Sequence, residues 1–306
     1  MKNSLILLSL FLVGAGCLNP SSVSDNDFEP VRGRATSPGT EQALEDGAYA
    51  RRLMTARSTD GLTYVQTGLW ISDQADAPDA VVGADGTIYL YYTGWNVGDR
   101  LNTSAVAISK DQGETWTYRY VELTGSDVIG RAVDPDVVLL EDGTFRLFFT
   151  AGNPQGIHYA EGTDGMNFVY KGSIFAQTDD IAINSTTHKI GDTWHMYAVS
   201  DDGTERLWHL TSTDGVTFAV YDLTSFPYNN VATMPSNGLW IEDRFHLFLF
   251  QHDGVIHSMW SKNGFDWYPD QGERLSPIGE ETYVKDSALV PLPNGEFLMV
   301  YVTNTP

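Results

Sequence analysis

Apolar, β-rich runs followed by a tight turn and a strand of alternating apolar and polar residues recur along the chain. The two clearest copies run from Pro78 through a turn at Asp85-Gly86 to Tyr92, and from Pro135 through Asp142-Gly143 to Thr150. Weaker copies span Ala182–Tyr197, Met234–Phe250 and Asp286–Tyr301. Such runs are typical of two neighbouring strands of one sheet. The pattern therefore predicts five pairs of adjacent strands.

A second pattern alternates with these pairs: a short turn that contains Asp or Asn and Gly, followed by an aromatic residue. Its copies lie at residues 58–64, 109–116, 162–168, 212–218 and 261–267, and their Asp or Asn positions are 51, 53, 50 and 49 residues apart. In such a turn the carboxylate accepts backbone N–H groups and Gly supplies a positive φ. A period near fifty residues is typical of repeat folds such as propellers.

The two patterns together predict an all-β fold, a five-bladed β-propeller with four antiparallel strands in each blade. The first Asp turn precedes the first strand pair, and the last pair, ending near Thr303, has no outer strands after it. We therefore expect residues 48–66 to complete the last blade. This closure makes residues 47–306 a single domain.

The N-terminus resembles an export signal that ends at a lipid-attachment site. Lys2 precedes an apolar stretch from Leu5 to Val13, and small residues lead to Cys17, the only cysteine of the chain. This order is typical of a bacterial lipoprotein signal over residues 1–17, with Cys17 as the acylated residue. Residues 18–46 are rich in Ser, Pro, Asn, Asp and Gly and are predicted to be a flexible tether. We expect an exported lipoprotein anchored to an outer membrane or cell surface.

The chain carries 40 acidic and 18 basic residues, a formal net charge of −22. This charge disfavours binding to nucleic acid or to anionic lipid headgroups. Neutral or cationic partners fit better, and an acidic surface also keeps an exported protein soluble.

Polar residues that precede the innermost strands are the candidates for chemistry, because the loops entering these strands gather at one end of a propeller channel, which we call the mouth. Five windows supply them, one from each blade: Asp76, Asp79, Trp95 and Arg100; Arg131, Asp134 and Asp136; Asp179, Asp180, Asn184 and His188; Asn229, Ser236, Asn237, His252 and Asp253; Glu280, Glu281, Lys285 and Asp286. Converging carboxylates suit glycoside hydrolysis, which needs one protonated and one ionised carboxyl group. Asp79 and Asp136 have a second interpretation, as caps of backbone amides at equivalent places.

The turn at 109–116, SKDQGETW, resembles the Asp-box of sialidases and related propellers. The site windows resemble those of the five-bladed glycoside hydrolases of families 43 and 32. In those families an Asp in the first blade is the base or nucleophile, an Asp-Pro in the second tunes pKa and orientation, and a Glu in the third is the acid. The catalytic candidates are Asp79, Asp134 and Asp136: the resemblance matches Asp134 to the second-blade Asp and Asp79 to the first, and either Asp134 or Asp136 is expected to form the acidic core with Asp79. Substrate contacts are then expected from Trp95, Arg131, Asn184, Asn237 and Asp286.

The chain departs from this family pattern in two blades. Asp79 follows a proline instead of preceding one and lies one or two places off register, and Ile183 or Asn184 stands where the family has its Glu. An amide cannot act as a general acid. Three explanations remain open: Asp180, Glu280 or Glu281 supplies the acid; a histidine, His188 or His252, does so; or the propeller binds a glycan or a protein without cutting it.

A sialidase is disfavoured, because those enzymes have six blades and three substrate-binding arginines, whereas Arg100 and Arg131 alone lie in suitable loops. No cofactor is expected from the sequence, and the resemblance allows a structural calcium ion on the propeller axis.

Overall fold

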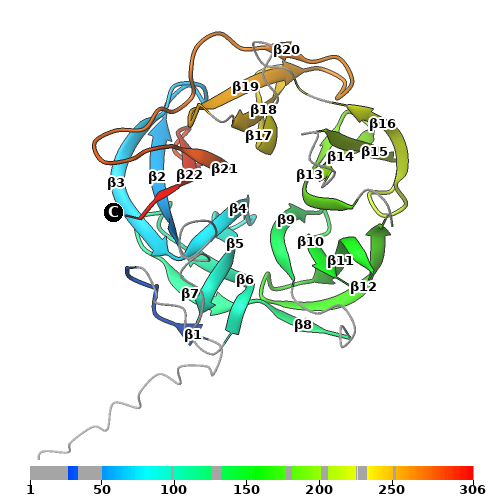
Figure 1. Cartoon of the computed structure of the whole chain (residues 1–306), viewed down its shortest axis with the longest axis horizontal. Helices are drawn as coiled ribbons and strands as arrows, with labels where there is room; N and C mark the ends of the chain where they lie inside the picture. The colour runs from blue at the N-terminus through cyan, green and yellow to red at the C-terminus, as the bar shows by residue number, and fades with distance from the viewer. Residues whose placement is uncertain are drawn as a thin grey trace, which may run out of the picture.

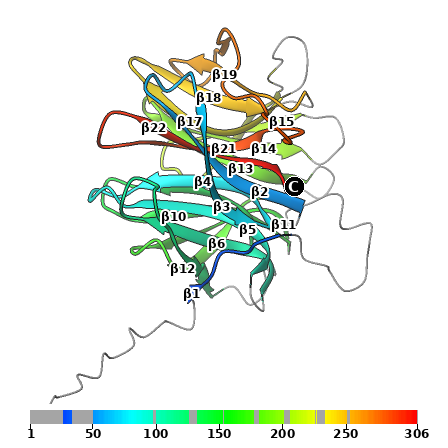
Figure 2. The same ribbon diagram turned by 90° about the vertical axis from the view of Figure 1, so that its left-hand side faces the viewer.

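The computed structural model describes residues 27–33, 50–97, 100–125, 132–152, 154–176, 181–200, 206–224, 226, 233–250 and 253–305, with the backbone alone at 95–97, 100–102 and 224. Five sheets surround a central axis and form a five-bladed β-propeller (Figure 1). Figure 2 shows the same ring turned by 90° about the vertical axis. The predicted fold class is confirmed.

Each blade is a sheet of four antiparallel strands. From the innermost strand outward, blade one contains β4 (Ala75–Val82), β5 (Ile88–Val97), β6 (Arg100–Ser109) and β7 (Thr117–Tyr120). In the same order, blade two contains β9 (Val133–Leu139), β10 (Phe145–Gly152), β11 (Gln155–Gly162) and β12 (Asn167–Phe175). Blade three contains β13 (Ala182–Ile190), β14 (Thr193–Ser200), β15 (Leu207–Ser212) and β16 (Ala219–Thr224).

The remaining strands complete the ring. Blade four contains β17 (Met234–Ile241), β18 (Arg244–Phe250), β19 (Ile256–Ser261) and β20 (Tyr268–Pro269). Blade five contains β21 (Lys285–Pro291), β22 (Phe297–Asn304), β2 (Arg51–Ser58) and β3 (Val65–Asp73). Two short outer strands are added to blades one and two: β1 (Asp27–Phe28) antiparallel to β7, and β8 (Glu122–Thr124) parallel to β12. All five predicted strand pairs are present as the two inner strands of a blade.

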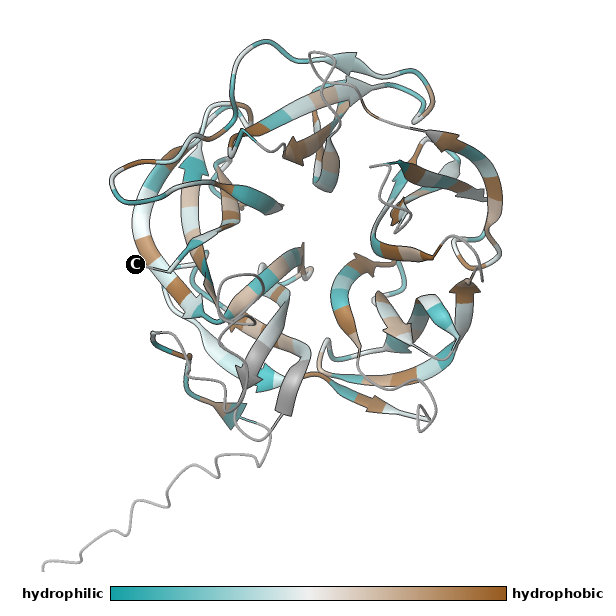
Figure 3. Cartoon of the chain, in the orientation of Figure 1, coloured by the Kyte–Doolittle hydropathy of each residue, from teal (hydrophilic) through white to brown (hydrophobic). Residues whose placement is uncertain are grey.

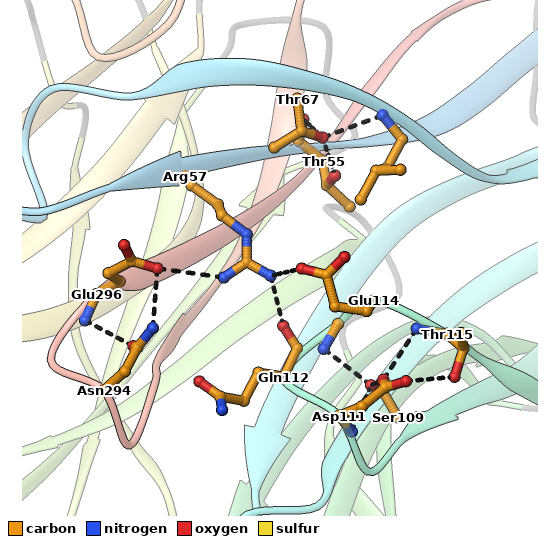
Figure 4. Close-up of polar contacts among 12 residues, drawn as sticks. Thr55, Arg57, Thr67, Ser109, Asp111, Gln112, Glu114, Thr115, Asn294 and Glu296 are labelled. Atoms are coloured by element: carbon orange, nitrogen blue, oxygen red, sulfur yellow. Dashed lines mark hydrogen bonds and ion pairs between the residues drawn. The ribbon is translucent and has the colours of Figure 1, made fainter.

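The ring closes in blade five, where chain segments from both ends pair. β2 runs antiparallel to β22 from Arg51 opposite Asn304 to Ser58 opposite Phe297. This confirms that residues near 48–66 complete the last blade, and β3 extends the closing segment to Asp73. Arg57 of β2 also joins blade five to the next blade: its guanidinium donates to the Gln112 carbonyl at 2.8 Å and to Glu114 at 2.7 Å (Figure 4).

The core is divided into five clusters of buried apolar side chains, each between two neighbouring blades. Between blades one and two, for example, Tyr91 of β5 packs with Leu147 and Phe149 of β10. The second strands of the blades are buried along most of their length, because each sheet packs both faces against its neighbours. Hydrophobic residues accordingly recur along the strands of every blade (Figure 3). Among the residues that the structure describes, each of these clusters spans two blades, so neighbouring blades depend on each other for their cores.

The repeated turns have the geometry expected from the sequence. The Asp214 carboxylate accepts the backbone N–H groups of Val216 and Thr217 at 2.8 and 2.7 Å, and Gly215 has φ of 71°. The same contacts recur at Asp60, Asp164 and Asn263. These turns close the outer strand pairs and lie away from the starts of the inner strands.

Residues 27–33 lie within the segment expected to be a flexible tether, and for them that expectation does not hold. β1 pairs with β7, Phe28 packs on Tyr120 with a centroid distance of 5.0 Å, and the guanidinium of Arg32 lies 3.8 Å from the centroid of the Trp70 ring. Apolar and cation–π contacts hold this segment, although its composition is mostly polar. It crosses from blade one to blade five.

The N-terminal predictions fall on residues 1–26, which include Cys17 and lie outside the described residues. In the part of the chain that is described, there is no helix with the length and apolar character that a membrane span requires.

Candidate functional site

Every innermost strand carries a β-bulge at the end where it begins. In blade one, Asp76 pairs with Thr93 and Asp79 pairs with Tyr91, so β4 advances by three residues where β5 advances by two. The other four blades show the same difference of one residue. A bulge inserts one extra residue and re-aims the neighbouring side chains. The mismatch falls at the same place in four blades, and in blade four it lies one residue further along, between Pro235 and Gly238. Blade four is aligned through its pairs Met234–Phe250 and Gly238–Leu247, which match Asp76–Thr93 and Ala80–Leu90 of blade one.

This alignment defines two layers of side chains. The bulge layer, at the mouth, consists of Ala77, Asp134, Asn184, Pro235 and Asp286, and the inner layer, two residues further along each strand, consists of Asp79, Asp136, Thr186, Asn237 and Ala288. All bulge-layer residues except Pro235 have positive φ, between 39° and 52°. Non-glycine residues at positive φ are uncommon, and they concentrate at functional sites.

The inner-layer aspartates are buried and bind the next blade. Asp79 is 5% exposed, and its carboxylate accepts the N–H of Val137 at 2.6 Å, the N–H of Ala80 at 2.8 Å and the amide of Asn237. Burial and the charge of the neighbouring Asp136 raise the pKa of Asp79 well above its ordinary value. This environment favours the interpretation of Asp79 as a link between blades rather than a group that touches substrate.

Asp136 makes the equivalent contacts to blade three. It is 2% exposed, and its carboxylate accepts the Thr187 N–H at 3.1 Å and the hydroxyl groups of Thr187 and Ser185 at 2.6 and 2.9 Å. Burial raises the pKa of Asp136 to about 7, against these hydrogen bonds. Both inner-layer aspartates therefore serve as the amide caps that the sequence offered as their second interpretation.

A cluster of charged side chains from blades five and one lies at the bulge layer. Lys285 Nζ lies 2.6 Å from Asp286 Oδ2 and 3.1 Å from Asp76 Oδ1, and Asp76 also pairs with Arg51. Asp134 lies beside this cluster, partly exposed. Burial and the negative charge of Asp286 raise the pKa of Asp134 to about 6, while Lys285 and Arg51 oppose the rise. Two carboxylates with different environments thus meet at the mouth.

Neighbouring threonines hold the strained bulges in place. Thr93 Oγ1 accepts the N–H of Asp134 at 2.8 Å, and Thr150 Oγ1 accepts the N–H of Asn184 at 2.8 Å. Each hydroxyl lies on the second strand of the preceding blade. Asp134 and Asn184 are therefore fixed from both their own blade and the one before.

The other predicted acids that the structure describes do not join this cluster. Glu281 accepts the Tyr301 hydroxyl at 3.0 Å and the Gln66 amide at 2.8 Å, and with Glu280 it lines a separate cavity of about 300 Å³. His188 hydrogen-bonds Thr186 at 2.8 Å, and burial lowers its pKa to about 3, so its imidazole is neutral near pH 7 and is not the imidazolium that a general acid would require.

Several predicted residues fall outside what the structure describes. These are the side chains of Trp95 and Arg100 and the whole of Arg131, Asp179, Asp180, Asn229 and His252. Of the remaining substrate-binding predictions, Asn184 and Asp286 lie in the bulge layer with Asp134, whereas Asn237 lies in the inner layer.

Sequence reasoning missed Arg51 as a part of the mouth. This residue lies in β2, opposite Asn304, and reaches the mouth because its strand completes blade five. The predicted ring closure was the signal that could have identified Arg51, because it places the start of β2 beside the end of β22.

The alignment also shows which residues of this chain occupy equivalent positions in the first three blades, where the sequence comparison expected one carboxylate per blade. Ala77 stands in blade one where Asp134 stands in blade two, and Asn184 stands at the same position in blade three. Asp79 is therefore displaced by two residues from the position of Asp134. Of these three mouth positions, the second blade alone carries a carboxylate, and Asp286 adds one from blade five.

A cavity of about 780 Å³ lies on the far side of the inner layer. Its walls come from residues that follow the inner layer, such as Val81, Val138 and Trp240, and are mainly apolar. Within the described ranges, no group of three or more His, Cys, Asp or Glu side chains is arranged to hold a metal ion. Calcium on the axis stays a prediction.

Comparison with known proteins begins with the sequence. No family model matches it. An uncharacterized protein of Mycobacterium tuberculosis is 28% identical over 161 residues, a match that covers 48% of this chain and 50% of the relative. The chain thus matches half the length of this curated relative.

Solved structures give the clearer comparison. A thermostable family-43 glycoside hydrolase has a TM-score of 0.58 at 15% identity and covers 74% of this chain and 88% of its own. A protein of unknown function from Dyadobacter fermentans has a TM-score of 0.56 at 13% identity (83% and 84% covered), and a family 117 glycoside hydrolase from Zobellia galactanivorans has 0.51 at 13% (85% and 92%). At these identities the likeness establishes a shared propeller fold.

Proposed function

We propose that this chain is a glycoside hydrolase that cleaves an oligosaccharide or polysaccharide at the channel mouth. The observation that carries the proposal is that Asp134, whose pKa is raised to about 6, lies near enough to Asp286 for the charge of Asp286 to contribute to that rise, while Asp286 itself lies 2.6 Å from Lys285 Nζ. Glycosidases need one carboxyl group that holds a proton and one that stays ionised. The shared fold with glycoside hydrolases supports the same assignment.

Each carboxyl group has a distinct role in this mechanism. Asp134 donates its proton to the glycosidic oxygen as the bond to the leaving sugar breaks. Asp286, which is 6% exposed and lies 2.6 Å from Lys285 Nζ, is proposed either to take a proton from an attacking water or to attack the anomeric carbon itself. Asp76, paired with Arg51 and Lys285, balances the two cations of the cluster.

Substrate contacts extend the site around these carboxyl groups. The Asn184 amide in the neighbouring bulge is suited to hydrogen-bond a sugar hydroxyl. Trp95 and Arg131, from the loops of blades one and two, are proposed to stack on and orient the sugar, and Asp180 remains a further candidate acid. A polymeric or surface-bound glycan would fit a protein exported and anchored through Cys17, which we propose as its location.

A second function, binding a glycan without cutting it, is favoured by one specific observation. Ala77 and Asn184 occupy the bulge positions equivalent to Asp134, and neither side chain can transfer a proton as an acid or base. For this second function, the mouth has the shape of a glycosidase site but lacks the carboxyl groups that hydrolysis requires in blades one and three.

Product analysis on a panel of glycans separates the two functions. The full chain is incubated with soluble plant, algal and host polysaccharides, and released sugars and retardation in affinity gels are measured together. The hydrolase predicts released product from wild type and none from Asp134→Asn, with Asp142→Asn, an exposed turn carboxyl in the same blade, active as the control. Retardation without product from wild type would favour the binding protein.

A further inference from the structure

The inner strands of blades three and four, β13 and β17, contact each other less than the inner strands of any other neighbouring blades. At the inner layer, Asp79 and Asp136 each accept a backbone N–H of the next blade. The equivalent residue of blade three, Thr186, instead hydrogen-bonds His188 of its own strand. The Asn237 amide of blade four reaches Asp79 of blade one, which is not its neighbour in the ring. The inner-layer contacts therefore leave the seam between blades three and four without a carboxylate link.

Both strands of this seam line the cavity of about 780 Å³. His188 and Lys189 of β13 and Leu239 and Trp240 of β17 are among its walls, and most of the other lining residues are aliphatic side chains of the remaining inner strands. A volume of this size is typical of sites for small organic ligands. The cavity and the mouth lie on opposite sides of the inner layer, so this cavity is distinct from the site proposed for hydrolysis.

His188 is the polar side chain that can orient a ligand in this cavity. Its Nε2 hydrogen-bonds Thr186 at 2.8 Å, and within the part of the chain that the structure describes no hydrogen bond engages Nδ1. The neighbouring polar groups are already paired, because the Asn237 amide and the Thr187 hydroxyl both donate to inner-layer aspartates. In a neutral imidazole, Nδ1 is a donor or an acceptor according to the tautomer. It can therefore pair with a group on a ligand.

A row of rings leads from the surface to this imidazole. Trp240 is 46% exposed, and its ring meets that of Phe245 edge-on with a centroid distance of 5.7 Å. The Phe245 ring lies 4.8 Å from the ring of His188. Aromatic side chains favour contact with other flat rings, either stacked or edge-on. The walls and the row of rings thus suit a flat apolar ligand.

We propose that this cavity binds an uncharged aromatic molecule that carries a hydroxyl group. The rings of Trp240 and Phe245 contact its aromatic part, and its hydroxyl pairs with His188 Nδ1, since a hydroxyl can both donate and accept. This binding is independent of the hydrolysis proposed at the mouth.

Other classes of ligand fit this cavity less well. A sugar has many hydroxyl groups, and the apolar walls would leave most of them without partners. An anion would be repelled by Glu141 and Asp142, exposed lining residues, and by the net charge of −22. A cation would lose its hydration against the apolar walls.

Isothermal titration calorimetry of the full chain tests this preference with three probes that share one ring system. These are a naphthol, a naphthalenesulfonate and a naphthylmethylammonium ion, which are neutral, anionic and cationic at pH 7. The naphthol should bind roughly tenfold more tightly than either charged probe.

Two variants assign the naphthol to this cavity. His188→Leu removes the ring nitrogens and keeps much of the bulk, and Trp240→Ala removes the exposed ring. Each should weaken naphthol binding about tenfold. Tyr268→Ala removes a ring of similar exposure, 51%, from the outer strand of the same blade, and as the matched control it should leave the affinity unchanged.

The outcomes decide the inference without reference to hydrolysis. No binding of the naphthol at millimolar concentration would overturn it, and so would tighter binding of either charged probe. An affinity unchanged in Trp240→Ala would overturn it as well, even should His188→Leu not fold. Where wild type releases sugar from a glycan, Trp240→Ala should release it at the same rate, so the two proposals can fail separately.

Discussion

Asp134 differs from the other aspartates of the inner strands in being both partly exposed and raised in pKa. Asp79 and Asp136 have raised pKa values as well, but their oxygens accept hydrogen bonds from the next blade and they are nearly inaccessible. Asp134 therefore combines a proton held near neutral pH with access to a ligand. That combination is what a general acid requires.

The pKa of Asp134 predicts an acidic pH optimum. A general acid must be protonated, and the pKa of Asp134 is raised to about 6. We expect kcat/KM to fall as pH rises above about 6, with a slope of one proton, measured as initial rates across a pH series. Full activity persisting to pH 9 would show that another group donates the proton.

Lys285 is predicted to set the pKa of Asp134 and to hold the Asp286 carboxylate in place. The charge of Lys285 lowers the pKa of Asp134, and Lys285 Nζ lies 2.6 Å from Asp286 Oδ2. Lys285→Met should reduce kcat by roughly ten- to a hundredfold and move the alkaline limb of the pH profile upward. Lys262→Met, an exposed lysine that pairs with Asp243, is the control, and equal effects of the two changes would argue against the role.

The sequence named Asp134 as a catalytic candidate together with Asp79 and Asp136, but it could not tell which of the three faces the mouth. Asp79 and Asp136 resemble each other in sequence, since both follow a proline, and they do occupy equivalent positions. Whether such a residue faces the mouth or the next blade depends on the one extra residue of the bulge. A backbone irregularity of this kind leaves no periodic signal in the sequence.

At the scale of the element, the bulge is the feature that places side chains of an innermost strand at the mouth. It occurs in all five blades, with positive φ at Ala77, Asp134, Asn184 and Asp286. Asp and Asn tolerate this conformation better than other non-glycine residues. Three of the four positions thus carry a residue type that both fits the backbone and offers a polar side chain.

Ala77 is the exception, and its strain predicts a stabilising substitution. Alanine at φ of 46° is strained, whereas glycine adopts this conformation freely. Ala77→Gly should raise the free energy of unfolding by about 0.5 to 1 kcal/mol, measured by chemical denaturation. Ala80→Gly, three residues along the same strand without a positive φ, should instead lower it, and a loss of stability in both variants would contradict the strain at Ala77.

At the scale of the whole molecule, the number of blades and the mode of closure could be predicted because they depend on spacing. Turns about fifty residues apart fix the count, and the order of turns and strand pairs assigns β2 and β3 to the last blade. Residues 27–33 could not be assigned in the same way. Their attachment depends on single contacts, such as Phe28 on Tyr120. The composition of the segment does not reveal such contacts.

This N-terminal segment is predicted to strengthen the seam at which the ring closes. Phe28 packs against the cluster between blades five and one, and Gly33 N–H donates to Asp73 of β3 at 2.5 Å. Deleting residues 18–33 should lower the melting temperature by several degrees, since burial of one Phe contributes about 1.5 to 3 kcal/mol.

Deletion of residues 18–26 alone is the matched control for that measurement. It leaves β1 and its contacts in place, so calorimetry should find the melting temperature of the full chain. Equal melting temperatures for both deletions would mean that the segment adds nothing to the seam.

The central claim is that a glycan is cleaved between Asp134 and Asp286 at the mouth. The measurement that tests it most directly is a crystal structure of Asp134→Asn bound to an oligosaccharide that wild type cleaves. The account predicts the glycosidic oxygen within about 3 Å of the residue 134 side chain, with the Asp286 carboxylate on the opposite side of the anomeric carbon. A glycan bound elsewhere, with residues 134 and 286 both free of it, would contradict the account.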